Sequence, residues 1–384
     1  MDQQNLLFAL LRSAIRGELL TEEEKKLCSP DILPALLTIS KKHDVAHLVA
    51  FALKQNGLLK AEDAKAGKSI YAAVFRGEKL TATLREVAKA LEAAKIPFIP
   101  LKGSVLRSYY PESWMRTSCD VDVLVHRQDL DRATKYLTST HGYTEQGRST
   151  HDVTLESPGG IHVELHFDLV EEGRAGDAMD VLAQLWDHVI LKENTAFSYE
   201  MSDPYFYFYH IAHMAKHFET GGCGIRPFID LYILDRLEGA ETASREALLQ
   251  KGKLARFAEV CRTLSRVWLE GETADPLSVQ MQTFLLHGGV YGSVDNRVAL
   301  NQTKRGGRFG YLFSRLFAPY EKLKRYFPVL EKHRWLTPVM QVRRWFMLFD
   351  PAVAKMAKAE LKTNNGLEKD RAEMLGDFLT DVGL

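Results

Sequence analysis

The sequence predicts an α+β protein in which a small mixed β-sheet core is flanked by an N-terminal and a C-terminal helical region. Apolar residues recur at i, i+3 and i+4 over residues 5–94, which is helical spacing. Residues 96–169 instead form short alternating runs separated by turns. Helical spacing returns after residue 200. We therefore expect three parts, with the boundaries 1–95, 96–195 and 196–384.

The composition is that of an ordinary globular protein. Of the 384 residues, 46% are hydrophobic and 26% are charged, which excludes disordered, collagen-like and coiled-coil chains. The 50 Lys and Arg residues balance the 50 Asp and Glu residues, so bulk charge does not draw the whole chain to a polyanion. The four cysteines form no CxxC pair and are too few for a disulfide scaffold, so a reducing compartment is expected.

The N-terminal segment predicts an amphipathic helix and no targeting signal. An acid stands at position 2, and the apolar run Leu6–Leu11 has only six residues, unlike a signal peptide. No stretch of the sequence reaches the 18 or more apolar residues of a membrane span. We therefore expect a cytoplasmic protein with no transmembrane segment.

The elements follow in order from these patterns. Helices are expected near 5–19, 31–40, 43–55 and 62–94, with breaks at Ser29-Pro30-Asp31 and Asn56-Gly57. The central part should contain a strand in IPFIP (96–100), a short helix at 106–110, a strand at 119–125, a helix ending at His141-Gly142, and a hairpin of strands 151–157 and 161–169. The C-terminal part should contain helices at 203–220, 227–238, 242–269, 274–287, 311–325 and 338–349, with a Gly-rich loop over 288–310.

Asp120 and Asp122 are the sharpest chemical signal in the chain. Alternate side chains of a strand share a face, so these two carboxylates point away from the buried valines between and after them. Two carboxylates about 7 Å apart, at roughly 3.3 Å per residue, repel each other unless a cation joins them. Mg²⁺ is the cation that prefers such oxygen ligands. The alternative is a pair of solvated charges on an edge strand.

Glu164 can complete this group. In the strand 161–169, Glu164 shares a face with His162, His166 and Asp168. If this strand pairs beside the first, three carboxylates meet, as in a two-metal site. His166 could tune Glu164 or touch a substrate, although a hydrogen-bonded sheet histidine is the preferred interpretation.

A turn at Lys102-Gly103-Ser104 precedes the Asp-x-Asp strand. A glycine lets backbone N–H groups approach a phosphate, the following helix N-terminus favours negative charge, and Ser104 adds a hydroxyl donor. The alternative is a plain helix cap after a strand.

These motifs together resemble the nucleotidyltransferase superfamily with the DNA-polymerase-β-type fold. The closer resemblance is to a bacterial branch of uncharacterised nucleotidyltransferases, and it extends over roughly residues 30–350. It rests on LKGSVLRSYYP (101–111), RTSCDVDVLV (116–125), GY (142–143), PGGIHVELHFDL (158–169), HIAHMAKHF (210–218), IRPFIDLYIL (225–234) and RLFAPYEKLKRYFPVLEKHRWLTP (315–338).

The resemblance implies a reaction and its residues. Gly103 and Ser104 match the phosphate-binding turn, and Asp120, Asp122 and Glu164 match the metal-binding carboxylates. It implies transfer of an NMP from ATP or another NTP to an acceptor hydroxyl by a two-metal mechanism using Mg²⁺ or Mn²⁺, with release of pyrophosphate. The acceptor could be a small molecule, a protein or RNA. A non-catalytic nucleotide- or RNA-binding module and a metal-dependent phosphohydrolase are the alternatives.

Several other residues are candidates for the same cleft. His210, His213 and His217 share one helix face, but HExxH is absent, which disfavours a metalloprotease. This face packs over the sheet or lines the cleft, and His217 is our nucleotide-binding candidate. Arg116 and Lys102 are candidates to bind phosphate oxygens, and Arg107 is a further candidate for the same role. We expect Arg226 to pair with Asp230, and the alternative is that it points into the cleft.

The segment 301–350 is basic. It holds eleven Lys and Arg residues and three acidic residues, a net charge of +8, interleaved with Tyr, Phe and Trp. A solvated face is the simplest interpretation, and an anionic partner such as nucleic acid or a lipid surface is the alternative.

Overall fold

The computed structural model describes residues 3–29, 31–59, 64–149, 151–169, 177–290, 292–366 and 369–384. Contacts group the chain into two units. The first contains residues 1–216 and 224–282, and the second contains residues 217–223 and 283–384. Among the described residues, no helix combines the length and the apolar character that crossing a membrane requires.

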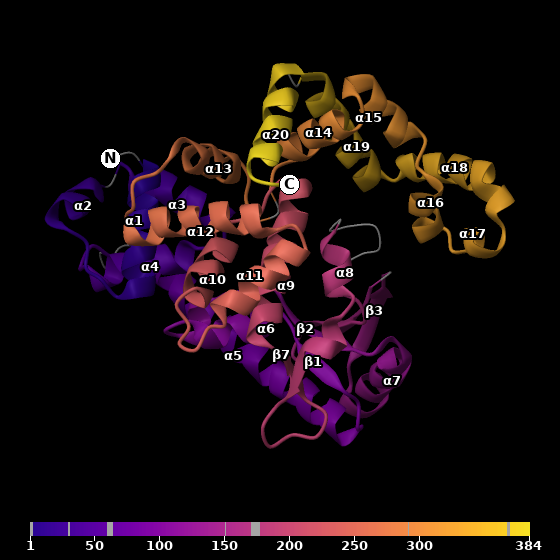
Figure 1. The fold of residues 1–384 in the computed structure, drawn as a ribbon, viewed down its shortest axis with the longest axis horizontal. Coiled ribbons are helices and arrows are strands. Elements are labelled where there is room, and N and C mark those ends of the chain that lie inside the picture. The colour runs from indigo at the N-terminus through magenta and orange to yellow at the C-terminus, as the bar shows by residue number, and fades with distance from the viewer. Residues whose placement is uncertain are drawn as a thin grey trace. The chain divides into compact units, whose positions relative to one another are not determined.

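The first unit is built around a five-stranded mixed sheet (Figure 1), which confirms the predicted α+β class. The strands run in the order β1-β2-β5-β4-β3, and the β2–β5 pair is parallel while the other pairs are antiparallel. Their bounds are β1 Phe98–Pro100, β2 Asp120–Val125, β3 Thr144–Arg148, β4 Asp152–Glu156 and β5 His162–His166.

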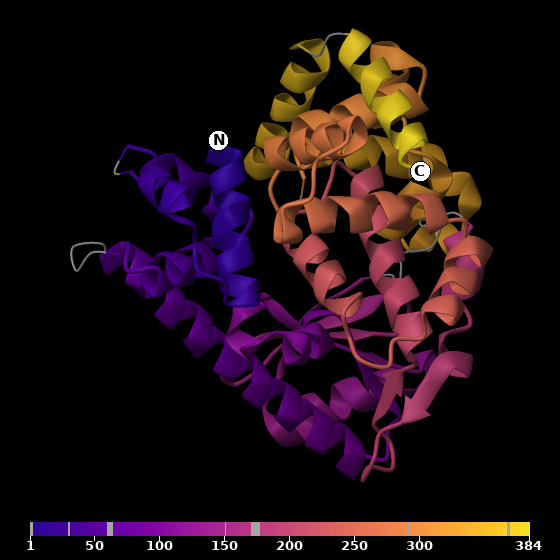
Figure 2. The same cartoon turned by 60° about the vertical axis from the view of Figure 1, so that its left-hand side comes forward.

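One face of this sheet is covered by two helices. Helix α5 (Ala64–Ala93) lies along the sheet in Figure 2, and α7 (Leu130–His141) packs on the same side. The alternate residues Val121, Val123 and Val125 are fully buried against these helices. Burying each such side chain contributes about 1.5–3 kcal/mol, so the alternation strongly selects this register. It also leaves the acidic residues of β2 on the opposite face.

The N-terminal helices agree with the spacing. They are α1 Gln3–Arg16, α2 Glu22–Leu27, α3 Leu33–Lys42 and α4 Ala46–Gln55. Thr21 and Glu24 form a capping box at the start of α2, and Gly57 ends the turn after α4 with a φ of +69°. Of the expected features, Pro30 and residues 62–63 lie outside the described residues.

The rest of the first unit is mainly helical. Its remaining elements, together with the helices that lead into the second unit, are α6 Gly103–Leu106, η1 Arg107–Tyr109, η2 Ser113–Met115, η3 Arg127–Asp129, α8 Ala178–Leu182, η4 Leu185–His188, β6 Val189–Leu191, β7 Tyr199–Met201, α9 Asp203–Glu219, α10 Arg226–Leu234, α11 Thr242–Lys251, α12 Ala255–Glu270 and α13 Pro276–His287.

The second unit is helical, and it corrects one expectation. Its elements are α14 Val294–Lys304, α15 Gly307–Leu316, α16 Tyr320–Tyr326, α17 Val329–Lys332, η5 Arg334–Leu336, α18 Thr337–Phe346, η6 Met347–Phe349, α19 Pro351–Gly366 and α20 Lys369–Asp381. The loop predicted over 288–310 is therefore wrong. Ser293 caps α14 through its side chain, and Val298 and Ala299 pack with Tyr311 and Ala372. The positive-φ glycines of this segment lie in the turn before α14 (Gly292) and at the start of α15 (Gly306 and Gly307).

Three strands escaped the sequence analysis. All five residues of β3, TEQGR, are exposed at the edge of the sheet, so the strand carries no apolar alternation. Strands β6 and β7 have three residues each and pair with one another in a two-stranded sheet. Backbone pairing decides such short or polar strands, and side-chain pattern does not reveal them.

Candidate active site

The parallel β2–β5 pair brings the predicted carboxylates together. Asp122 lies directly opposite Glu164, and Asp120 lies opposite His162. All of these positions belong to the sheet face that the valines leave free. This is the arrangement that the alternation of both strands predicts.

Asp122 is the centre of a buried polar cluster. Its Oδ1 accepts hydrogen bonds from Lys102 Nζ at 2.9 Å and from His166 Nε2 at 2.8 Å. His166 Nε2 also lies 3.2 Å from Glu164 Oε2. The imidazole therefore connects the two carboxylates, and Lys102 supplies a neighbouring positive charge.

The charges in this cluster shift several pKa values. Burial raises the pKa of Asp122, but Lys102 and His166 outweigh burial and hold it well below its usual range. The hydrogen bond from His166 similarly lowers the pKa of Glu164. The pKa of Asp120 is instead raised to about 6, by burial and by the charges of Asp122 and Glu164. Negative charge is therefore in excess at Asp120.

Oxygen donors suited to a hard divalent cation are present. Ligand atoms of Asp122, Glu164 and His166 lie within 4.8 Å of one another, whereas Asp120 lies outside this compact group. Both hydrogen bonds of Asp122 within the described residues involve Oδ1, which leaves Oδ2 available. The Glu164 side chain is 31% exposed, so a cation can reach it from solvent.

The predicted phosphate turn has an unusual backbone. Lys102 has a φ of +45°, a conformation that costs a non-glycine residue about 1–3 kcal/mol and is concentrated at functional sites. Gly103 is favoured for a different reason, because a Cβ there would lie 3.1 Å from both Arg116 Nη1 and Ser118 Cβ, and these side chains would have to move by a few tenths of an ångström. Ser104 is buried, and its hydroxyl has no hydrogen-bond partner in the described part of the chain.

Arg116 is engaged elsewhere. Its guanidinium binds Asp230 on α10 through two contacts, Nε–Oδ1 at 3.1 Å and Nη2–Oδ2 at 2.9 Å. Tyr110 donates a further hydrogen bond of 2.6 Å to the same carboxylate. The predicted pair of Arg226 with Asp230 is wrong, because Arg226 binds Asp44 at 2.8 Å instead. The nucleotide-binding role expected of Arg116 stays a prediction.

Arg107 is a buried cation that has no carboxylate partner among the described residues. It is only 5% exposed, and its hydrogen bonds go to the Gly103 carbonyl (2.9 Å) and Ser118 Oγ (2.8 Å). Its Nη1 has no partner, and within the described residues it forms no ion pair with a carboxylate. Burial and the neighbouring Arg116 lower the pKa of Arg107 to about 10. A buried cation without a counter-ion, one helical turn after Gly103, suits an anionic ligand.

Helix α9 contributes Tyr209, which the sequence analysis missed. Tyr209 is 2% exposed, and its hydroxyl has no hydrogen-bond partner among the described residues. The pKa of Tyr209 is raised, mainly by burial. Lys102 lowers this pKa, and Asp122 and Glu164 raise it, so the ring lies close enough to the carboxylate cluster to feel its charges. Nothing in the run YFYFYH distinguishes this tyrosine from its packed neighbours.

The three histidines of the predicted helix face have different environments. His210 is buried, and its Nε2 lies 2.9 Å from the Pro227 carbonyl, which is a structural contact. His213 packs beside Tyr209, with ring centroids 6.2 Å apart. His217 is half-buried and belongs to the second unit, and its nucleotide-binding role stays a prediction.

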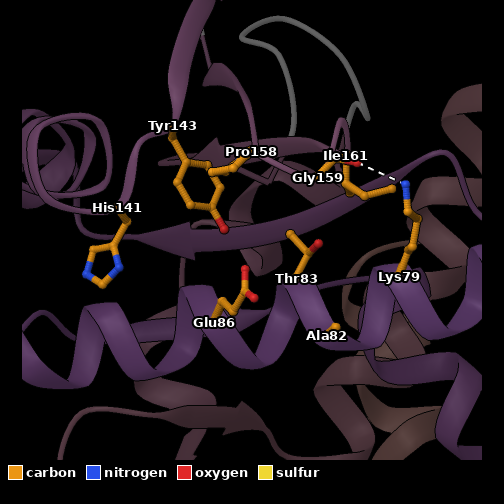
Figure 3. A pocket seen from close by; sticks show the side chains of 9 residues that line it. All are labelled: Lys79, Ala82, Thr83, Glu86, His141, Tyr143, Pro158, Gly159 and Ile161. Carbon is orange, nitrogen blue, oxygen red and sulfur yellow. Dashed lines mark hydrogen bonds between the residues drawn. The ribbon is translucent and has the colours of Figure 1, made fainter.

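A separate pocket of about 530 Å³ lies on the helix-covered side of the sheet (Figure 3). Residues of α5, including Thr83 and Glu86, face Tyr143 and Ile161 across it. None of the predicted site residues lines it. This pocket is therefore distinct from the carboxylate cluster.

The sequence was compared with protein families, curated proteins and solved structures. A family model described as an uncharacterised nucleotidyltransferase matches residues 32–270, which include the turn, the three carboxylates and Arg107. No curated protein and no solved structure matches the chain.

Proposed function

This chain belongs to the family of uncharacterised nucleotidyltransferases, and we propose that it transfers an NMP from an NTP to an acceptor hydroxyl and releases pyrophosphate. The observation that carries this proposal is a set of unsatisfied buried groups beside the carboxylates. The Arg107 Nη1 and the Ser104 hydroxyl have no partners in the described residues, and both flank the Gly103 turn. A phosphate would satisfy both groups.

The carboxylates fit a divalent cation. Mg²⁺, or Mn²⁺ in its place, held by Asp120, Asp122 and Glu164 as one or two ions would neutralise the phosphate oxygens and make the acceptor hydroxyl more acidic. The raised pKa of Asp120 agrees with this assignment, since burial and the charges of Asp122 and Glu164 raise it, and a cation would offset both.

The chain's own residues position and stabilise the reactants. The Gly103 turn, Ser104 and Arg107 would hold the β- and γ-phosphates, so that the acceptor oxygen attacks the α-phosphorus in line. The bond between the α-phosphorus and the oxygen that bridges the α- and β-phosphates then breaks, and pyrophosphate leaves from the same turn. Glu164, which is partly exposed, would receive the acceptor proton and pass it to solvent. His166 keeps Asp122 and Glu164 in place.

Thermal stability with nucleotides tests the donor site directly. ATP, GTP, CTP and UTP would each be added with and without Mg²⁺. A ligand at ~100 times its Kd stabilises the folded protein by about 2.7 kcal/mol, so we expect a Mg²⁺-dependent rise in Tm of several degrees. Asp120→Asn should reduce this rise. Asp168→Asn, which alters a half-exposed carboxylate paired with Arg127, should leave this rise unchanged.

The outcomes separate the alternatives. Absence of a shift with every NTP at millimolar concentration would contradict the donor site. A shift without pyrophosphate release in the presence of candidate acceptors would indicate a binding module. Release of free nucleotide or phosphate without an acceptor would indicate a hydrolase.

Two tyrosines of α9 provide a matched test of Tyr209. We expect Tyr209→Phe to leave Tm unchanged, because its hydroxyl makes no hydrogen bond in the described residues, and to lower kcat/KM about 10-fold through loss of a contact with the charged substrate. Tyr205 donates a hydrogen bond of 2.8 Å to the Leu182 carbonyl. Tyr205→Phe should therefore lower Tm and spare transfer. The same result for both variants would refute the role of Tyr209.

A further inference from the structure

His166 faces a second group of metal-ligating side chains. Asp152 on β4 lies opposite His166 in the β4–β5 register, and His151 precedes it. Ligand atoms of His151, Asp152 and His166 lie within 4.8 Å of one another. The rings of the two histidines are 5.8 Å apart. These side chains extend the polar face of the sheet away from Asp122.

The free nitrogen of His166 points to a ligand. His166 is 2% exposed, and its Nε2 is occupied by Asp122 and Glu164. Those ionised carboxylates only accept, so Nε2 keeps a proton, and Nδ1 is the nitrogen that has a lone pair when the ring is neutral. This Nδ1 is buried and has no hydrogen-bond partner in the described part of the chain. A carboxylate that orients one histidine nitrogen while the other is free is the arrangement of metal-binding histidines.

The other two ligands are already close. His151 Nε2 lies 3.0 Å from Asp152 Oδ2. Two donor atoms that share one cation at about 2.1 Å are separated by roughly 3.0–3.4 Å, so a cation could replace the proton between them with little movement. The ring proton of His151 would then be on Nδ1, where Ser149 Oγ lies at 3.1 Å and can accept it.

We propose that His151, Asp152 and His166 bind a Zn²⁺-class cation, at a site separate from the oxygen-donor site for Mg²⁺. Two imidazole nitrogens and one carboxylate suit Zn²⁺ and disfavour Mg²⁺. Three protein ligands leave the fourth position open to water or a substrate group. Through His166, this ion also orients Asp122 and Glu164 of the proposed active site.

Binding of Zn²⁺ to the whole protein, without nucleotide, tests this site. We expect one equivalent by calorimetry and by metal analysis after dialysis, unaffected by a large excess of Mg²⁺. Co²⁺ in its place should give the visible absorption of a four-coordinate site in the wild-type protein. His151→Ala and Asp152→Asn should each weaken Zn²⁺ binding at least 10-fold. His162→Ala, which removes an exposed histidine of the same strand, should bind as the wild type does.

Two results would contradict the proposed Zn²⁺ site. No stoichiometric Zn²⁺ in the wild-type protein, or equal affinity in His151→Ala, Asp152→Asn and the wild type, would overturn the proposal. Circular dichroism shows whether each variant is folded. The Co²⁺ spectrum needs no variant, so misfolding of a mutant does not remove the test. Because the nucleotide shift is measured separately, failure here is distinguishable from failure of the proposed transferase function.

Discussion

Replacing Asp122 by asparagine is expected to reduce nucleotidyl transfer by at least about 10³-fold, the largest loss of activity that we predict. Asp122 is 3% exposed and binds both Lys102 and His166. An amide has no negative charge, so it neither balances the Lys102 ammonium nor neutralises a divalent cation. The measurement is the rate of pyrophosphate release with a labelled NTP and its acceptor.

Stability must be separated from chemistry in this variant. Asp122→Asn leaves the Lys102 ammonium without its carboxylate, which should cost about 2–3 kcal/mol of unfolding free energy, with a quarter of the Lys102 side chain still exposed to solvent. The double variant Lys102→Met/Asp122→Asn removes both charges and should regain part of the lost Tm, yet remain inactive. Transfer at the wild-type rate by Asp122→Asn would refute the metal assignment.

Replacing Asp230 by asparagine is expected to give the largest loss of stability. Asp230 is fully buried and receives two contacts from Arg116 and one from Tyr110. Removing one partner of a buried ion pair costs about 3–5 kcal/mol, because the other charge is left uncompensated. The pair also joins α10 to the segment that enters β2, so its loss should disturb the placement of Asp120. Tm by calorimetry measures the effect.

The effect of Asp230 should depend on pH. Arg116 and Tyr110 outweigh burial and hold the pKa of Asp230 below its usual value. A carboxylate with a lowered pKa stabilises the fold above its ordinary pKa of about 3.9, and this contribution is lost as the pH falls towards the folded-state pKa. The gap in Tm between wild type and Asp230→Asn should therefore be full at pH 7 and narrow below about pH 4.

Asp235 provides the control for this prediction. It lies just beyond the same helix and accepts a hydrogen bond of 2.7 Å from Tyr207, but burial raises its pKa. Asparagine resembles a protonated aspartate, so Asp235→Asn should cost much less than Asp230→Asn. Equal losses of Tm in the two variants would contradict the Arg116–Asp230 account.

Local periodicity was enough to predict the core of the site. Alternation along β2 and β5 assigns the valines to one face and Asp122 and Glu164 to the other, whatever the rest of the chain does. The two carboxylates then meet as soon as the two strands are neighbours in the sheet. The same reasoning placed His166 beside Glu164, although it preferred a structural role and did not anticipate the contact with Asp122.

Partner choice could not be predicted in this way. The sequence offers Arg107 and Arg116 as candidates for phosphate oxygens and favours a pair of Arg226 with Asp230. Only the fold shows that Asp230 binds Arg116, that Asp44 binds Arg226, and that Arg107 forms no ion pair within the described residues. These contacts join residues 114 and 182 positions apart in the chain. No local pattern encodes such pairs.

The sequence by itself determined the α+β class, the carboxylate face, the glycine turn and the family resemblance, because each depends on spacing within a few residues or on a short motif. Only the tertiary structure decided that Tyr209 lies near the carboxylates, that Arg107 is a buried cation with no carboxylate partner among the described residues, and that residues 294–304 form a helix. Those outcomes depend on which distant surfaces bury one another, and burial and charge pairing are properties of the packed chain.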